Sequence, residues 1–179
     1  MRIVSRSRES PYGTGGDITK IINPKNKPET CVTCHQDKAA QLHLPGAHPI
    51  VDGKVTCVDC HSVHKEKATP ATGHGMTAAD QTCFECHQLQ SGPFVFEHEA
   101  MREGCSFCHD PHGTGNDKML RSRDANTCLQ CHLADMDTEG IQIGGQAHAG
   151  RNFLSQGTCW TAGCHEGVHG SNVSPKLRF

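Results

Sequence analysis

The chain has 179 residues, and its 17 Lys and Arg nearly balance 19 Asp and Glu, for a formal net charge of −2. This balance argues against a basic nucleic-acid-binding surface, and no apolar run approaches the roughly 18 residues that span a membrane. Val, Ile, Leu and Phe make only 30 residues, 17 % of the chain, which is too few for an ordinary side-chain core. Because the chain also holds 12 Cys and 14 His, we expect a cofactor to fill its interior.

The first 30 residues contain neither Cys nor His. They also lack the apolar stretch of a signal peptide. Ser10 to Gly15 reads Ser-Pro-Tyr-Gly-Thr-Gly and parallels Asp110 to Gly115, which reads Asp-Pro-His-Gly-Thr-Gly. We therefore expect residues 1–30 to carry a partial repeat without its Cys pairs, in which Tyr12 takes the place of a His.

From residue 31 onward, the 12 Cys form six pairs with none left over, and a His follows each pair. Five pairs have the spacing CxxCH, and the last is stretched to CX4CH. The pairs and their His are Cys31, Cys34 and His35; Cys57, Cys60 and His61; Cys83, Cys86 and His87; Cys105, Cys108 and His109; Cys128, Cys131 and His132; and Cys159, Cys164 and His165.

CxxCH is the attachment motif of c-type haem. Residues i, i+3 and i+4 share one face of a helical turn, so two thiols can bind the porphyrin while the adjacent His reaches the iron. Three alternatives fit less well. Zinc sites use paired Cys but need no His after each pair, a thioredoxin-like site needs a single CxxC, and a disulfide framework needs no such spacing. The sequence predicts six covalently bound haem c groups.

The six motifs are arranged as three copies of a two-haem unit. We place the units at 31–82, 83–127 and 128–179, as parts of one continuous haem domain. Each unit reads as a motif, an upstream His, a second motif and a last His. The upstream His are His48, His98 and His148, and the last His are His64, His112 and His169.

These six additional His equal the number of second axial positions, so we expect two His ligands on every iron. Met recurs at no fixed repeat position, and His43 and His74 are surplus; His43 competes with His48, which we prefer because His48-Pro49 suits a rigid turn before the next motif. His61 and His64 lie three residues apart and point the same way. We therefore expect His64, His112 and His169 to serve neighbouring haems, in a quasi-linear chain of haems in sequence order.

The predicted fold is mostly coil, with short α-helices wrapped around a haem core and little or no β-sheet. Short helices are expected at or near each haem motif, and residues 128–139 could form one longer helix. Gly and Pro supply the tight turns between the haem sites.

The arrangement resembles the doubled-CXXCH multihaem cytochromes, and most closely the DmsE-like and MtrA-like decahaem family. The residues that carry this resemblance are CVDCHSVH at 57–64, CSFCHDPHGT at 105–114 and CWTAGCHEGVHGS at 159–171, each with a His upstream. The resemblance implies electron transfer between the periplasm and the outer surface. Six motifs in place of ten and the stretched last motif depart from the family pattern.

We therefore expect an electron-transfer protein rather than an enzyme, exported to the periplasm or the cell exterior, with its signal peptide absent from this chain. Its partners would be other redox proteins, as donor and acceptor, with no nucleic acid and no membrane span in this chain. Two alternatives stay open. One is a multihaem reductase with an open haem, and the other is a subunit of a cytochrome filament that self-associates head to tail.

Overall fold

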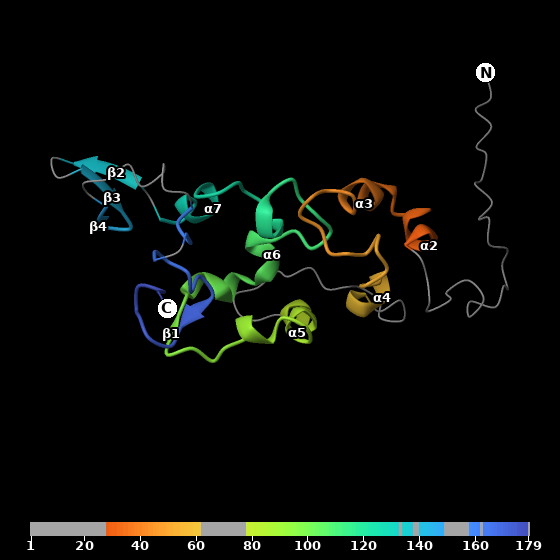
Figure 1. Ribbon diagram of the computed structural model, residues 1–179, viewed down its shortest axis with the longest axis horizontal. Helices are drawn as coiled ribbons and strands as arrows, with labels where there is room; N and C mark the ends of the chain where they lie inside the picture. The colour runs from red at the N-terminus through yellow and green to blue at the C-terminus, as the bar shows by residue number, and fades with distance from the viewer. Residues whose placement is uncertain are drawn as a thin grey trace, which may run out of the picture.

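The computed structural model describes residues 28–61, 78–132, 134–137, 140–148, 158–161 and 163–178. The partial repeat expected around Tyr12 lies outside these ranges, as do His64 and His74. The described chain is elongated: the helices of the first unit lie at one end of the long axis, and a small sheet of the third unit lies at the other (Figure 1).

Short helices accompany the Cys pairs. They are α2 (Glu29–Val32), α4 (Cys57–Cys60), α5 (Ala78–Phe84), α6 (Cys105–Cys108) and α7 (Asn126–Leu129), while α3 (Gln36–Gln41) follows the first motif. Three 3-10 turns complete the set: η1 (Gln88–Gln90), η2 (Glu99–Glu103) and η3 (Asp117–Met119). Local capping defines where some of them start. In α4 the Asp59 carboxylate accepts hydrogen bonds from the Thr56 N–H and hydroxyl at 2.6 and 2.9 Å.

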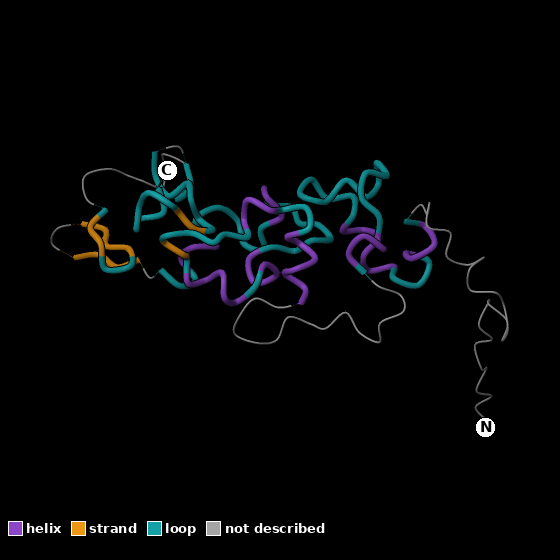
Figure 2. The backbone as a smooth tube through the Cα atoms, turned by 90° about the horizontal axis from the view of Figure 1, so that it is seen from below, coloured by secondary structure: helices purple, strands orange, loops and turns teal. Residues whose placement is uncertain are grey.

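Two small antiparallel sheets lie in the second and third units (Figure 2). Strands β1 (Phe96–Glu97) and β5 (Gly170–Ser171) form one, and β2 (Ala134–Asp137), β3 (Gly140–Ile143) and β4 (Gln146–Ala147) form the other in that order. The longer helix that the sequence allowed over 128–139 is therefore absent, because α7 ends at Leu129 and residues 134–137 pair with β3. Gly144 and Gly145, with φ of 56° and 72°, make the tight turn that joins β3 to β4.

The aliphatic core is thin. Among the described residues, the buried hydrophobic side chains are Leu42, Ile50, Leu120 and Ala125, whereas Leu89, Val95 and Val173 are 86 %, 70 % and 70 % exposed. No helix in the described part of the chain is long and apolar enough to cross a membrane. Since so few apolar side chains are buried, contacts between them contribute little to holding the units together.

Consecutive units are joined by the same backbone contact, used twice. We call the three residues that end at each upstream His the lead segment (46–48, 96–98 and 146–148). The residues from one before to two after the last His are the tail segment (111–114 and 168–171). Gly46 of the first unit pairs with Thr114 of the second, and Phe96 of the second pairs with Ser171 of the third. Both pairs join the position two before the upstream His to the position two after the next unit's last His.

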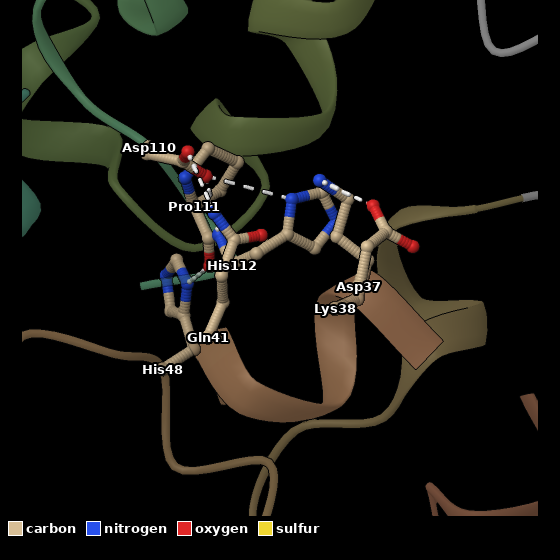
Figure 3. Close-up of polar contacts among 7 residues, drawn as sticks. All are labelled: Asp37, Lys38, Gln41, His48, Asp110, Pro111 and His112. Carbon is tan, nitrogen blue, oxygen red and sulfur yellow. Dashed lines mark hydrogen bonds and ion pairs between the residues drawn. The ribbon is translucent and has the colours of Figure 1, made fainter. Parts of the chain in front are cut away.

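Side chains complete the contact between the first two units (Figure 3). The Gln41 amide lies 3.4 Å from the Asp110 carboxylate, and the Nδ1 atom of His48 lies 2.9 Å from the Pro111 carbonyl oxygen. Gly113 fits where a side chain could not, since a Cβ atom there would collide with the Gln41 carbonyl oxygen. The units therefore interlock through backbone and His side chains.

Candidate haem-binding sites

Each of the five CxxCH pairs lies on one helical turn that presents its thiols and its His together. In the five CxxCH motifs, the backbone N–H of the His donates to the carbonyl oxygen of the first Cys at 2.8–3.0 Å. None of the 12 Cys is in a disulfide, and each is at least partly exposed. The local geometry thus matches the requirement for two thiols and one imidazole on a single face.

The stretched motif forms the same backbone hydrogen bond between its His and its first Cys. His165 donates its N–H to the Cys159 carbonyl oxygen at 3.0 Å, despite the two additional residues. Gly163, with φ of 81°, and a hydrogen bond from the Thr158 N–H to the Thr161 hydroxyl at 2.9 Å accommodate the insertion as a bulge. The last motif can therefore present its groups as the other five do.

The Cys pairs form a continuous series along the chain. Within each unit, the first thiols of the two motifs are within hydrogen-bonding reach of each other: Cys31 and Cys57, Cys83 and Cys105, and Cys128 and Cys159. Between units, Cys60 is near Cys83 and Cys86, and Cys108 is near Cys131. Each motif therefore neighbours the next in sequence order.

These contacts shift the pKa values of the thiols. A hydrogen bond from Cys105 lowers the pKa of Cys83 to about 7, and the same contact raises the pKa of Cys105. A hydrogen bond from Cys128 likewise lowers the pKa of Cys159 to about 7. A thiolate is the reactive form of Cys, so these contacts favour that form on one thiol of each pair.

Five motif His face five non-motif His. The ring centres are separated by 6.0 Å for His87 and His48, 5.9 Å for His61 and His112, 6.1 Å for His132 and His98, 6.2 Å for His109 and His169, and 6.4 Å for His165 and His148. In four of the five pairs the two residues come from different units. His48 and His98 reach the first motif of the next unit, whereas His112 and His169 reach the second motif of the preceding one.

The separations fit one metal ion between two imidazoles. A metal–nitrogen bond of about 2 Å on each side, plus about 1.1 Å from each nitrogen to its ring centre, places the ring centres about 6 Å apart. Direct stacking of two rings does not require so uniform a distance, since aromatic pairs spread over roughly 4.5–7 Å. The donor set in each pair is therefore suited to an iron with two axial His.

Backbone carbonyl groups orient the imidazole rings. The Nδ1 atoms of His109 and His165 lie 2.7 and 2.6 Å from the carbonyl oxygens of Lys118 and Lys176, which follow the last His of their units by six and seven residues. The Nδ1 atom of His98 lies 2.7 Å from the Val168 carbonyl oxygen, and that of His48 lies 2.9 Å from the Pro111 carbonyl oxygen. A Nδ1–H held by a carbonyl leaves Nε2 free for a metal.

Burial keeps two of these rings neutral. Burial lowers the pKa of His112, and the Lys38 ammonium lowers it further, while Asp110 acts in the opposite direction. Burial also lowers the pKa of His169, and the neighbouring His rings add to the effect. Only the neutral imidazole has the lone pair that binds a metal, so the site environment favours the ligating form.

The structure thus brings together ten of the twelve His singled out in the sequence. His35 is in the described chain without a described ring partner, and His64 lies outside the described residues. His43 is exposed, whereas His48 faces His87. The carbonyl groups that orient the rings were not singled out from the sequence. Lys118 and Lys176 lie in two similar segments, HGTGNDKML at 112–120 and HGSNVSPKL at 169–177, and this similarity was the available signal. Where the structure describes the chain, no three His, Cys, Asp or Glu converge as a closed zinc site would require.

Comparisons with known proteins agree with this geometry. A family profile described as "Doubled CXXCH motif" matches residues 98–137. A protein of Shewanella baltica (strain OS185), named multiheme cytochrome MtrA, is 32 % identical over 156 residues, which cover 85 % of this chain. The chain is a multihaem c-type cytochrome of the MtrA-like type. It spans 46 % of that relative's length.

Membership of this class indicates which cofactor the Cys pairs bind. A multihaem cytochrome of the doubled-CXXCH type binds haem c covalently, and the profile covers His98, His112 and the motifs at 105–109 and 128–132. The other three CxxCH motifs share the helical turn and the His hydrogen bond of these two, and the last motif shares the hydrogen bond.

Proposed function

We propose that this cytochrome is an electron-transfer protein with six haem c groups, each held between two axial His. The observation that carries the proposal is the set of five His pairs with ring centres 5.9–6.4 Å apart, each made of one motif His and one non-motif His. When bound, haem supplies reversible one-electron chemistry at its iron. The chain's part is to hold the groups, to fix their order and to leave no coordination position open.

The order of the motifs supports conduction along the molecule. Thiols of consecutive motifs neighbour each other from Cys31 and Cys57 at one end to Cys128 and Cys159 at the other. Since each motif anchors the edge of one porphyrin, we infer a haem series that follows the sequence and runs along the long axis in Figure 1. The two end motifs are then the points of contact for a donor and an acceptor protein.

The sixth haem needs a partner for His35. By elimination, we assign it His64, because the five described pairs use every other upstream and last His.

The cellular context follows from the class. Covalent haem attachment in cytochromes of this type takes place outside the cytoplasm, and the MtrA relative supports an exported protein. We propose the periplasm or the cell exterior as its location and other redox proteins as its partners.

The decisive experiment counts haems and open irons. Pyridine-haemochrome analysis with intact-protein mass should give six haems, and electron paramagnetic resonance of the oxidised protein should show low-spin ferric signals alone. A mass with five haems would remove the assignment of the last motif. A high-spin ferric signal in the native protein would instead favour the reductase alternative, which needs one open iron.

A further inference from the structure

The lead segment of the third unit pairs with a strand of its own unit. In the first two units, the residue two before the upstream His bonds to the tail segment of the next unit: Gly46 donates to the Thr114 carbonyl oxygen at 3.1 Å and accepts from its N–H at 2.9 Å. The matching residue of the third unit is Gln146, which pairs with Ile143 of β3 in its own unit.

The register shows that β3 occupies the edge of the chain used for docking in the other units. His148 donates its N–H to the Ile141 carbonyl oxygen at 2.8 Å. Backbone groups alternate along a strand, so those of Gln146, two residues earlier, face β3 as well. A tail segment could pair with β4 only in a register shifted by one residue, which would turn every side chain to the other face.

This arrangement sets the position of the His148 ring and its partners. His48 and His98 have Nδ1 against a carbonyl of the next unit's tail segment, whereas Nδ1 of His148 lies 2.9 Å from the carbonyl oxygen of Gln146 in its own unit. His48 and His98 face a motif His of the next unit. His148 instead faces His165 of the same unit, with ring centres 6.4 Å apart.

The sequence provides the additional residues for this hairpin. His132 and His148 are 16 positions apart, against 13 for His35 and His48 and 11 for His87 and His98. The longer segment contains the Gly144-Gly145 turn, whose positive φ angles suit a two-residue hairpin turn. An uncovered lead segment would be a bare strand edge, which is prone to pair with another chain.

We propose that strands β2 and β3 form a terminal cap, in which β3 replaces the tail segment of a following two-haem unit. A unit with this cap ends the haem series and redirects its upstream His to its own second haem. The redirection of His148 rests on the two-His haem sites proposed above, whereas the covered strand edge does not. The cap also closes this end against filament growth through the contact that joins the units.

The first test replaces residues 133–147 with residues 88–97, the shorter segment between the same two His of the second unit. His148 is kept, but β3 is removed. All six haems should stay attached, and one of the six should become high-spin in the monomeric protein, as measured by electron paramagnetic resonance and light scattering. If all six haems stay low-spin in a monomeric variant, the cap does not direct His148 and the proposal fails.

Two point variants test whether β3 covers the strand edge, without reference to haem spin. Gly145→Ala and Gly53→Ala place the same methyl group at φ of 72° and 69° with no atom within 4 Å, but only Gly145 lies in the turn that joins the cap to β4. Amide hydrogen exchange of the holoprotein should accelerate roughly 5–30-fold at Gln146 and His148 in Gly145→Ala, the factor expected of a non-glycine residue in this region. Gly53→Ala should leave both amides at the native rate.

Equal exchange in the two variants, or unprotected amides in the native protein, would overturn the cap itself. A native protein with fewer than six low-spin haems would overturn the proposed ligand sets. In that case the exchange result still decides whether β3 covers the edge, so the two proposals fail separately.

Discussion

The contact between the first and second units depends on a position where no side chain fits. Gly113 is buried with φ of 134°, and a Cβ atom there would collide with the Gln41 carbonyl oxygen and lie 3.0 Å from the Ala47 side chain. We predict that Gly113→Ala forces the second unit's tail segment away from the first unit. The His48 ring would then lose its carbonyl partner at Pro111, and His112 would move from His61.

The magnitude follows from two costs. A non-glycine residue in a sparsely populated backbone region costs about 1–3 kcal/mol, and overpacking against fixed atoms costs about 1–3 kcal/mol more. The contact should therefore weaken by about 2–6 kcal/mol. Since about 1.4 kcal/mol is a factor of ten, even the lower limit raises the open population about 30-fold.

Amide hydrogen exchange at Gly46 and Thr114 measures this opening directly, because each donates its N–H to the other's carbonyl oxygen. The matched control is Gly115→Ala, in the same loop, where no atom lies within 4 Å of the added methyl group. Exchange at both amides should rise about 30-fold or more in Gly113→Ala and stay near native in Gly115→Ala. If the two variants exchange alike, the steric reasoning is wrong.

Further predictions concern single side chains. His98→Ala should turn one haem high-spin without loss of haem, whereas His43→Ala should leave the spectrum unchanged; a spectral change in His43→Ala would mean that a ligand is misassigned. Asp80, 2 % exposed, accepts the Cys105 N–H at 2.8 Å, so Asp80→Ala should lower the free energy of unfolding by about 1–3 kcal/mol. A denaturant midpoint equal to that of the native protein would contradict this. Replacing both Cys of the last motif with Ser should reduce the haem mass from six groups to five.

Several features were determined by the sequence alone, because they are local. The spacing of CxxCH places two thiols and an imidazole on one helical turn whatever the rest of the chain does. The threefold repeat of motif, upstream His, motif and last His gave the candidate ligands, and the preference for His48 over His43 came from its proline. The expectation that His112 and His169 reach past their own motifs also came from sequence, since residues three apart point the same way.

The pairing of the His rings was decided by the tertiary structure. The repeat alone cannot say that His48 faces the next unit and His112 the preceding one, because these contacts join residues 39 and 51 positions apart through backbone pairing of neighbouring units. The same limit explains why the helix expected over 128–139 is absent. Pairing of residues 134–137 with residues 140–143 outweighed the local helix propensity. His148 resembles His48 and His98 in sequence, yet it turns back to its own unit because β3 already holds the strand edge beside it.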